Sequence, residues 1–302
     1  MEQHVPQETV EAARVLAEQK LIDVVVAMGG GSSMGVGKGV VVGGGRSLLA
    51  VPTTYSGSEM TPVFGTTNRV EGRKSVRRDP AVLPKVVIYD PEVTLDLPPQ
   101  LTAATAINAL AHSVEACYAR DVNPLIPPVA LDGIRRIVRS LPLCIANGGD
   151  VEAREDLLIG AYLAGFSIAN ATMALHHGIC HVLGGRTGVA HGVLNSIMLP
   201  HVMRFNADAV PDAMTAILDA MSAPRNLPPP LRGRVGVGGR SAPETVAALV
   251  ASLPVPQRLR EAGVPEAVLY SVAAEAAGNS AVQANPKPVN KAGIRELLRA
   301  AW

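Results

Sequence analysis

The sequence predicts an α/β domain followed by an all-α domain. At 302 residues the chain is long enough for two hydrophobic cores, and chains of this size commonly divide in two. Short Val-rich segments separated by Gly-rich turns occupy the first third, as in a buried parallel sheet. After Leu97-Pro98-Pro99 the apolar residues recur with helical spacing. We therefore expect domains at residues 1–95 and 96–302, with the boundary near residues 92–100.

Composition and charge exclude several functional classes. Hydrophobic residues make up 48%, charged residues 18% and aromatic residues 3%, so aliphatic side chains must fill the interior. A net charge of +1 gives no bulk field for binding nucleic acid or a membrane surface. We find no apolar run that is long enough and free enough of glycine to span a bilayer. Three cysteines, an odd number, and a start without a basic and apolar signal region indicate a reducing cytoplasm.

The first predicted elements surround a glycine-rich turn. Residues 7–19 are expected to form a helix and residues 22–28 a buried strand. The motif GGGSS then allows a tight turn and opens a helix whose free N–H groups can face a phosphate. The alternatives are a plain strand-to-helix loop and, for the lysine, a solvated face. The candidates for binding a cofactor here are Gly29, Gly30, Gly31, Ser32, Ser33 and Lys38.

A second hydroxyl-rich stretch follows the next strand. Residues 48–51 are expected to form this strand, which runs into the sequence PTTYSGSEMTP. Ligands of open α/β sheets bind at the carboxyl ends of strands, so these hydroxyls favour a binding role over simple surface polarity. They belong to Thr53, Thr54, Ser56 and Ser58.

A basic run separates this stretch from the third predicted strand, at residues 86–89. It contains Arg73, Lys74, Arg77 and Arg78. Such a run most often forms a solvated hairpin, but its place between two strands that feed one cleft also allows it to line an anionic pocket.

The remaining sequence is predicted to be helical. Ala and Leu content and a period of 3.6 residues predict helices at residues 101–119, 127–140, 151–168, 172–183, 192–203, 208–221, 243–253, 256–262, 265–277 and 291–300. The Pro- and Gly-rich residues 223–242 are expected to form a surface loop.

Histidines concentrate in the segment from Thr105 to His201. Asn108 and His112 are four residues apart and share one helix face. His177 and His181 repeat this spacing, and a Gly184-Gly185 break is expected to end their helix before His191. Imidazoles from two helices and a loop would then surround one point, as in a metal centre or a proton-handling pocket. His4, His176 and His201 are better explained as structural or exposed.

These motifs together resemble a known family. GGGSS with a later lysine, PTTYSGSEMTP, RRDPAVLPKVVIYDPEVTLDLP, INALAHSVEACYARDVNP and ALHHGICHVLGG occur in the same order in the iron-containing alcohol dehydrogenase superfamily. Within that superfamily the chain looks most like the maleylacetate reductases. The resemblance implies an NADH- or NADPH-binding domain, a helical domain, and an active site between them. It also implies reduction of maleylacetate to 3-oxoadipate in the breakdown of aromatic compounds, by a homodimer. Composition and charge already lead us to expect a cytoplasmic chain that binds neither nucleic acid nor membrane.

The resemblance also assigns roles at the histidines. Where the superfamily has an Asp and three His as metal ligands, this chain has Asn108, His112, His177 and His191, and His181 is similar to a further histidine that faces the substrate. A neutral amide is a weak ligand for iron or zinc, so we expect a site that needs no metal.

We expect the same five residues to be catalytic. Hydride transfer to an activated double bond beside a 4-oxo group leaves an enolate, which imidazoles can stabilise and protonate near neutral pH. The candidates for binding the dicarboxylate substrate are Tyr55, Arg77, Lys85 and Arg120.

The chain also departs from the family at its start. The family begins with a strand, a helix and a strand that are absent before Met1 here, so we expect an incomplete sheet with an open edge and weaker support for the adenosine half of the cofactor. This segment would also decide between NADH and NADPH. Two explanations of the short start stay open: a wrongly chosen initiator Met and a natural short form.

Two other functions also stay open. The chain could be a metal-dependent alcohol dehydrogenase or carbonyl reductase, or a non-catalytic short paralogue.

Overall fold

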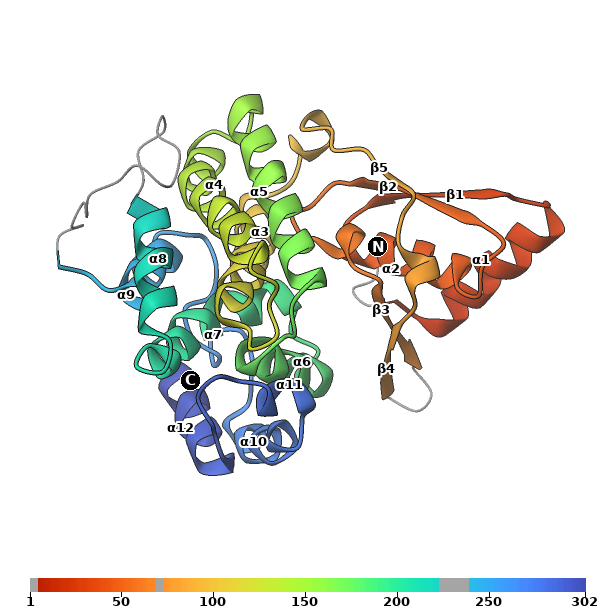
Figure 1. Ribbon diagram of the computed structural model, residues 1–302. Coiled ribbons are helices and arrows are strands. Elements are labelled where there is room, and N and C mark those ends of the chain that lie inside the picture. Colours follow the sequence, from red (N-terminus) through yellow and green to blue (C-terminus); the bar gives the residue numbers. More distant parts are fainter. Residues whose placement is uncertain (1–4, 69–72, 223–238) are drawn as a thin grey trace.

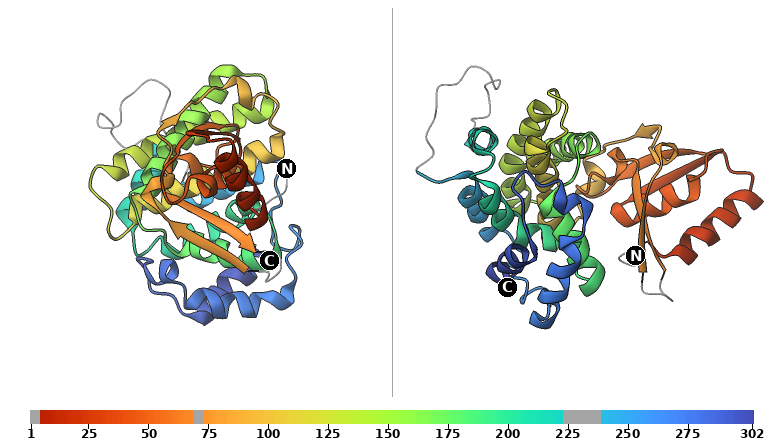
Figure 2. Two further views of the ribbon diagram at one scale, coloured as in Figure 1. Left: turned by 90° about the vertical axis from the view of Figure 1, so that its right-hand side faces the viewer. Right: turned by 60° about the horizontal axis from the view of Figure 1, so that its bottom comes forward.

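The computed structural model describes residues 5–68, 73–222 and 239–302. Within these ranges an N-terminal α/β part lies beside a larger helical part (Figure 1). Figure 2 shows the same two parts side by side from two further directions. The predicted fold class, an α/β domain with a small parallel sheet followed by an all-α domain, is confirmed.

The N-terminal part is built on a parallel sheet. Its strands, in spatial order, are β1 (Val24–Gly29), β2 (Ser47–Pro52) and β5 (Val86–Val87). Helices α1 (Gln7–Gln19) and α2 (Gly31–Val41) both lie on one side of this sheet (Figure 1). The predicted helix at residues 7–19 and the three predicted strands are confirmed, although the third strand is shorter than expected.

Helix α2 lies close to its neighbours because its contact positions have no side chains. A Cβ atom at Gly37 would lie 2.8 Å from the Cβ of Ala27, and one at Gly39 would lie 2.6 Å from Val10. Real side chains do not approach so closely, so only glycine permits this packing. The helix that follows the glycine-rich turn is thereby held against the strand that precedes it.

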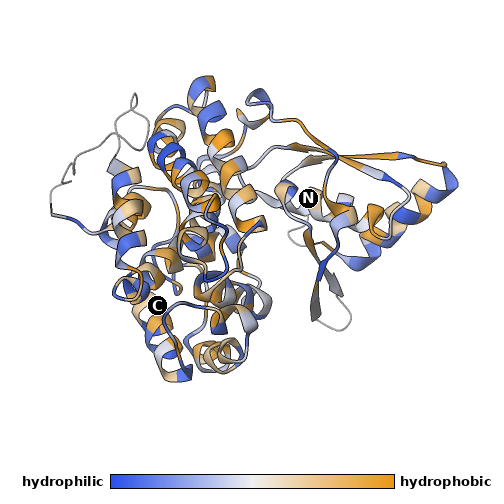
Figure 3. Ribbon diagram, viewed as in Figure 1, coloured by the Kyte–Doolittle hydropathy of each residue, from blue (hydrophilic) through white to orange (hydrophobic). Residues whose placement is uncertain are grey.

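The opposite face of the sheet is open to solvent. Val24, Val26 and Met28 point outward from β1 with 52%, 60% and 57% of their surface exposed, and Val86 of β5 is 51% exposed. Figure 3 shows the hydrophobic colouring of these strands. Parallel sheets are normally covered on both faces, whereas this one is covered only on the side of α1 and α2 (Figure 1).

A two-stranded antiparallel sheet carries the basic run. It consists of β3 (Val63–Asn68) and β4 (Arg73–Arg78), with Phe64 opposite Arg77. Residues 75–78 are exposed, as expected for a solvated hairpin. Strand β3 was not predicted, since its sequence VFGTTN is short and contains a glycine.

The helical part is organised around α3, which is buried on nearly all sides and packs against α4, α5 and α7. Its helices are α3 (Pro99–Tyr118), α4 (Ile126–Ala146), α5 (Val151–Ala169), α6 (Leu175–Thr187), α7 (His191–Asn206), α8 (Pro211–Ser222), α9 (Ala242–Ala251), α10 (Leu269–Ala277), α11 (Ser280–Gln283) and α12 (Lys291–Ala301). None of the helices in the described ranges is long and apolar enough to cross a membrane.

Two sequence predictions in this part are wrong. Residues 256–262 form turns instead of a helix, since the segment is short, starts at Pro256 and leads to Gly263 with φ of +81°. Helix α6 does not end at Gly184-Gly185 but continues to Thr187 and stops at Gly188, whose φ is +70°. Most of the predicted loop at 223–242 lies outside the described residues.

Candidate active site

Four histidines from three helices converge on one point. His112 lies on α3, His177 and His181 on α6, and His191 at the first position of α7. The rings of His112 and His177 stack with centroids 4.7 Å apart, and those of His181 and His191 stack at 5.1 Å. His177 is also 5.9 Å from His191, which joins the two pairs. The structure thus brings together all four histidines that the sequence singles out.

A buried carboxylate lies behind His177. Glu115, one turn after His112 on α3, accepts a hydrogen bond from Nδ1 of His177 at 2.7 Å and from the backbone N–H of His176 at 2.8 Å. Burial raises the pKa of Glu115, while the charge of His176 and the backbone N–H groups lower it. Burial also holds the pKa of His177 well below its ordinary value, as do the nearby rings of His176 and His181, so this imidazole is neutral.

Asn108 is fixed by hydrogen bonds at both ends of its amide. Its Nδ2 donates to the carbonyl of Ser56 at 3.1 Å, and its Oδ1 accepts from Nδ2 of Asn195 at 3.1 Å. Asn195 also donates to the carbonyl of His191 and contacts Nε2 of His176 at 2.6 Å. One network therefore ties Asn108 to α6 and α7.

Asn108 makes this site a poor match for a divalent metal, because a neutral amide is a weak ligand. The amide oxygen of Asn108 is already occupied by Asn195. In the described part of the chain no group of three or more His, Cys, Asp or Glu residues is arranged to hold a metal ion. Iron and zinc sites in proteins need such a converging set of donors.

The turn after β2 connects the sheet to the histidines. The carbonyl of Ser56 accepts the hydrogen bond from Nδ2 of Asn108. The next residue, Gly57, has a left-handed backbone with φ of +71°. A Cβ atom at Gly165 of α5 would lie 2.8 Å from the carbonyl oxygen of Gly57 and 3.0 Å from its Cα. The turn and α5 therefore touch backbone to backbone, at a contact between the two parts of the chain.

The glycine-rich turn fits the phosphates of a dinucleotide. Gly29 has φ of +138°, and Gly30 precedes the first turn of α2, whose N–H groups point out of the helix. A Cβ at Gly30 would fall 3.0 Å from the side chain of Thr54, so the two loops form one cradle. The hydroxyl of Thr54 is buried there and has no hydrogen-bond partner among the described residues. Such a group is suited to a phosphate oxygen.

Lys38 and Tyr55 do not occupy the predicted positions. The buried ammonium of Lys38 donates to the carbonyls of Ser58, Thr61 and Val63 at 2.5, 2.7 and 2.8 Å, so it braces the turn rather than reaching a phosphate. Burial lowers the pKa of Lys38 to about 8. Tyr55 is fully buried, and its hydroxyl accepts from Nη1 of Arg154 at 3.1 Å, within the helical core. We therefore assign both side chains to holding this turn in place, a correction to the sequence expectation.

The three basic residues expected at the substrate lie in different places. Arg77 is exposed on β4. Lys85 is exposed and its backbone bonds to Leu48, near the amino end of β2 and away from the histidines. Arg120 donates to the backbone carbonyl of Asn285 at 2.6 Å. The positions of Lys85 and Arg120 argue against the predicted clamp.

Some functional residues had no clear sequence signal. Asn195, which holds Asn108, contacts it from a distant part of the sequence. The sequence singles out Ser56 for its hydroxyl, but it is its backbone carbonyl that binds Asn108. Glu115 could have been found from its place three residues after His112, which puts it near the same helix face. His176 is buried against Asn195 and His201 is partly buried, in keeping with their predicted structural roles.

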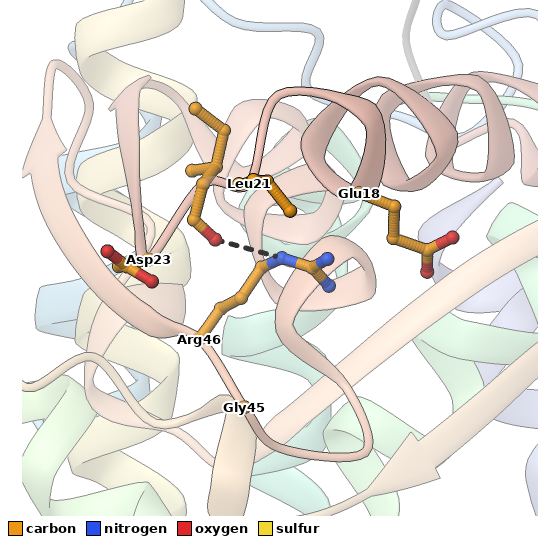
Figure 4. Close-up of a pocket in the computed structure, with 6 residues that line it drawn as sticks. Glu18, Leu21, Asp23, Gly45 and Arg46 are labelled. Carbon is orange, nitrogen blue, oxygen red and sulfur yellow. Dashed lines mark hydrogen bonds between the residues drawn. The ribbon is translucent and has the colours of Figure 1, made fainter.

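A shallow hollow elsewhere on the molecule is separate from this site. Arg46 donates from Nε to the carbonyl of Ile22 at 3.2 Å, where α1 leads into β1. Figure 4 shows Arg46 in this hollow with Leu21 and Asp23. Asp23 and Arg46 lie at the amino ends of β1 and β2, whereas the glycine-rich turn follows the carboxyl end of β1. We assign it no role in cofactor binding.

Comparison with known proteins identifies the family of the chain. Residues 1–91 match the family described as iron-containing alcohol dehydrogenase, and residues 102–302 match the C-terminal part of the Fe-containing alcohol dehydrogenase family. The chain is 39% identical to the maleylacetate reductases of Sphingobium indicum and Burkholderia cepacia, over 99% of its own length and 79% of theirs.

Solved structures give the same relationship. The crystal structures of maleylacetate reductase from Agrobacterium tumefaciens and from Rhizobium sp. strain MTP-10005 each superimpose with a TM-score of 0.88 at 36% identity. Each match covers 100% of this chain and 80% of the other.

Proposed function

The chain belongs to the iron-containing alcohol dehydrogenase family of oxidoreductases, and from this premise we propose that it reduces maleylacetate to 3-oxoadipate with NADH or NADPH. The observation that carries the proposal is the set of four imidazoles around an amide, Asn108, whose oxygen is already hydrogen-bonded. We propose that such a site handles protons without a Lewis acid. The relatives named maleylacetate reductase support the choice of substrate.

The glycine-rich turn and the turn after β2 would hold the cofactor. Gly29 to Gly31 let the backbone approach the pyrophosphate, and the N–H groups at the start of α2 favour its negative charge. Thr54 would donate its buried hydroxyl to the same group. When bound, the reduced nicotinamide supplies a hydride to the double bond conjugated with the substrate's 4-oxo group. The choice between NADH and NADPH stays open.

The histidines would handle the charge and the proton that follow hydride transfer. An enolate needs hydrogen-bond donors at its oxygen and then a proton at carbon. His181 and His191 are partly exposed and stack on each other, which places two imidazoles where a ligand can reach them. His177 is buried, whereas His112 is partly exposed like the other two. Burial and the neighbouring rings lower the pKa of both His112 and His177, so they serve as neutral hydrogen-bonding groups.

The test is oxidation of NADH or NADPH, followed by absorbance, with maleylacetate as substrate and EDTA present throughout. We expect turnover that EDTA does not change. A rate that disappears in EDTA and returns with iron or zinc would favour a metal-dependent dehydrogenase. A folded protein that binds neither nucleotide would instead be a non-catalytic paralogue. Light scattering of the same sample tests the homodimer that the family resemblance implies.

A further inference from the structure

Glu115 uses both carboxylate oxygens at the start of α6. Oε1 accepts the N–H of His176 at 2.8 Å, while Oε2 accepts the N–H of Ala174 at 3.1 Å and contacts Nδ1 of His177 at 2.7 Å. The side chains of Glu115 and His177 are 0% and 1% exposed, so water does not compete for these bonds. Their geometry is therefore set by the protein alone.

The pattern of donors fixes where the imidazole proton lies. Two backbone N–H groups point at the carboxylate, which marks both of its oxygens as acceptors. With Glu115 ionised, Nδ1 of His177 carries the hydrogen of the neutral ring, because it faces Oε2. Nε2 is then left with a lone pair, and it is buried without a partner among the described residues.

We propose that Glu115 is a positioning residue that holds His177 in its Nδ1–H tautomer, so that Nε2 serves the histidine cluster only as a hydrogen-bond acceptor. Neutral His177 then has no proton to give at Nε2. The proton that reaches the substrate then comes from another ring, and His112, His181 and His191 are all partly exposed. The assignment of proton donation to another histidine rests on the proposed function. The assignment of the His177 tautomer does not depend on it.

Glu115 also has a purely structural role from which the proposal must be separated. Its negative charge and its two backbone bonds stabilise the first turn of α6. Loss of the carboxylate would weaken that turn whether or not the tautomer matters. A readout at the ring nitrogens is therefore needed in addition to a rate.

The first experiment uses the wild-type chain with 15N-labelled histidine. Long-range 1H–15N spectra distinguish protonated from unprotonated ring nitrogens, and the spectrum of His177→Gln assigns the His177 signals. We expect protonated Nδ1 and unprotonated Nε2. A wild-type spectrum with the hydrogen on Nε2 overturns the proposal without the need for any variant at Glu115.

The second experiment compares Glu115→Gln with Ser113→Ala. In either orientation of the new amide, its NH2 group faces a backbone N–H at the start of α6, that of Ala174 or that of His176. Neither orientation satisfies all the donors, so the tautomer of His177 is no longer fixed. We expect signals of both tautomers, with kcat lowered by roughly 10- to 100-fold, as when metal-ligating histidines lose their carboxylate partners. The Kd for NADH should not change.

Ser113 is the matched control because it is buried on the same helix and its hydroxyl has no partner among the described residues. Ser113→Ala should keep both the tautomer and the rate. If Glu115→Gln also keeps both, the carboxylate only stabilises α6 and the proposal fails. An Nδ1–H spectrum in a wild-type chain that does not reduce maleylacetate would support the role of Glu115 and reject the substrate.

Discussion

Gly165→Ala tests whether the backbone contact between α5 and the turn after β2 sets the geometry of the site. The added methyl would lie 2.8 Å from the carbonyl oxygen of Gly57, 3.0 Å from its Cα and 3.0 Å from the Cβ of Met60. Two of these three atoms are backbone and cannot rotate away. The turn that carries Ser56 must therefore move relative to α5.

The expected cost combines two opposing effects. Alanine in place of glycine stabilises a helix by about 0.8–1.0 kcal/mol. Overpacking a tight contact costs about 1–3 kcal/mol. Gly185→Ala isolates the first effect, because Gly185 is also helical and exposed, and its Cβ would meet nothing within 4 Å. The two variants should thus differ in free energy of unfolding by about 1–3 kcal/mol, with Gly165→Ala the less stable.

The assays are chemical denaturation and steady-state kinetics on both variants. A displaced turn moves Ser56, which holds Asn108, so kcat/KM should fall in Gly165→Ala and stay unchanged in Gly185→Ala. Equal stability and equal kcat/KM in the two variants would show that the contact at Gly57 is not needed, and the reasoning would be refuted.

Three further predictions follow from the site. His177→Ala and His181→Ala should each lower turnover by about 100-fold or more without unfolding the chain, whereas His201→Ala should not; equal rates would remove the cluster from catalysis. Asn108→Asp should raise the zinc retained after dialysis, measured by mass spectrometry, toward about one ion per chain, and an unchanged content would reject our account of the amide. The free energy of unfolding of the wild-type chain, minus that of Lys38→Met, should rise by up to about 3 kcal/mol between pH 8 and 10.5, because Lys38 loses its proton in the folded chain before it does in the unfolded chain. A difference that does not change with pH in denaturation experiments would contradict the lowered pKa of Lys38.

The sequence predicted well what depends on local pattern. The helix at residues 7–19 and the turn at Gly29 follow from periodicity and glycine, and the ordered motifs correctly indicated the family. Spacing along two helices also placed His112 and His177 close together.

What it could not predict depends on contacts between distant segments. The end of α6 was misplaced because packing carries the helix past two glycines to the left-handed Gly188. The roles of Glu115 and Asn195 arise only when α3, α6 and α7 meet. Lys38 follows the glycine-rich turn as a phosphate ligand would, yet its carbonyl partners lie 20 to 25 residues later.

Because Lys38 donates hydrogen bonds to three backbone carbonyls, the rate at which its amine reacts depends on opening of the folded structure. An amine reagent can modify this side chain only after the bonds to Ser58, Thr61 and Val63 have opened, because the folded protein leaves none of it exposed. Acylation should therefore be fast at the exposed Lys85 and slow at Lys38. Mass spectrometry of the two peptides over time would then report how often the N-terminal part opens, with no added probe.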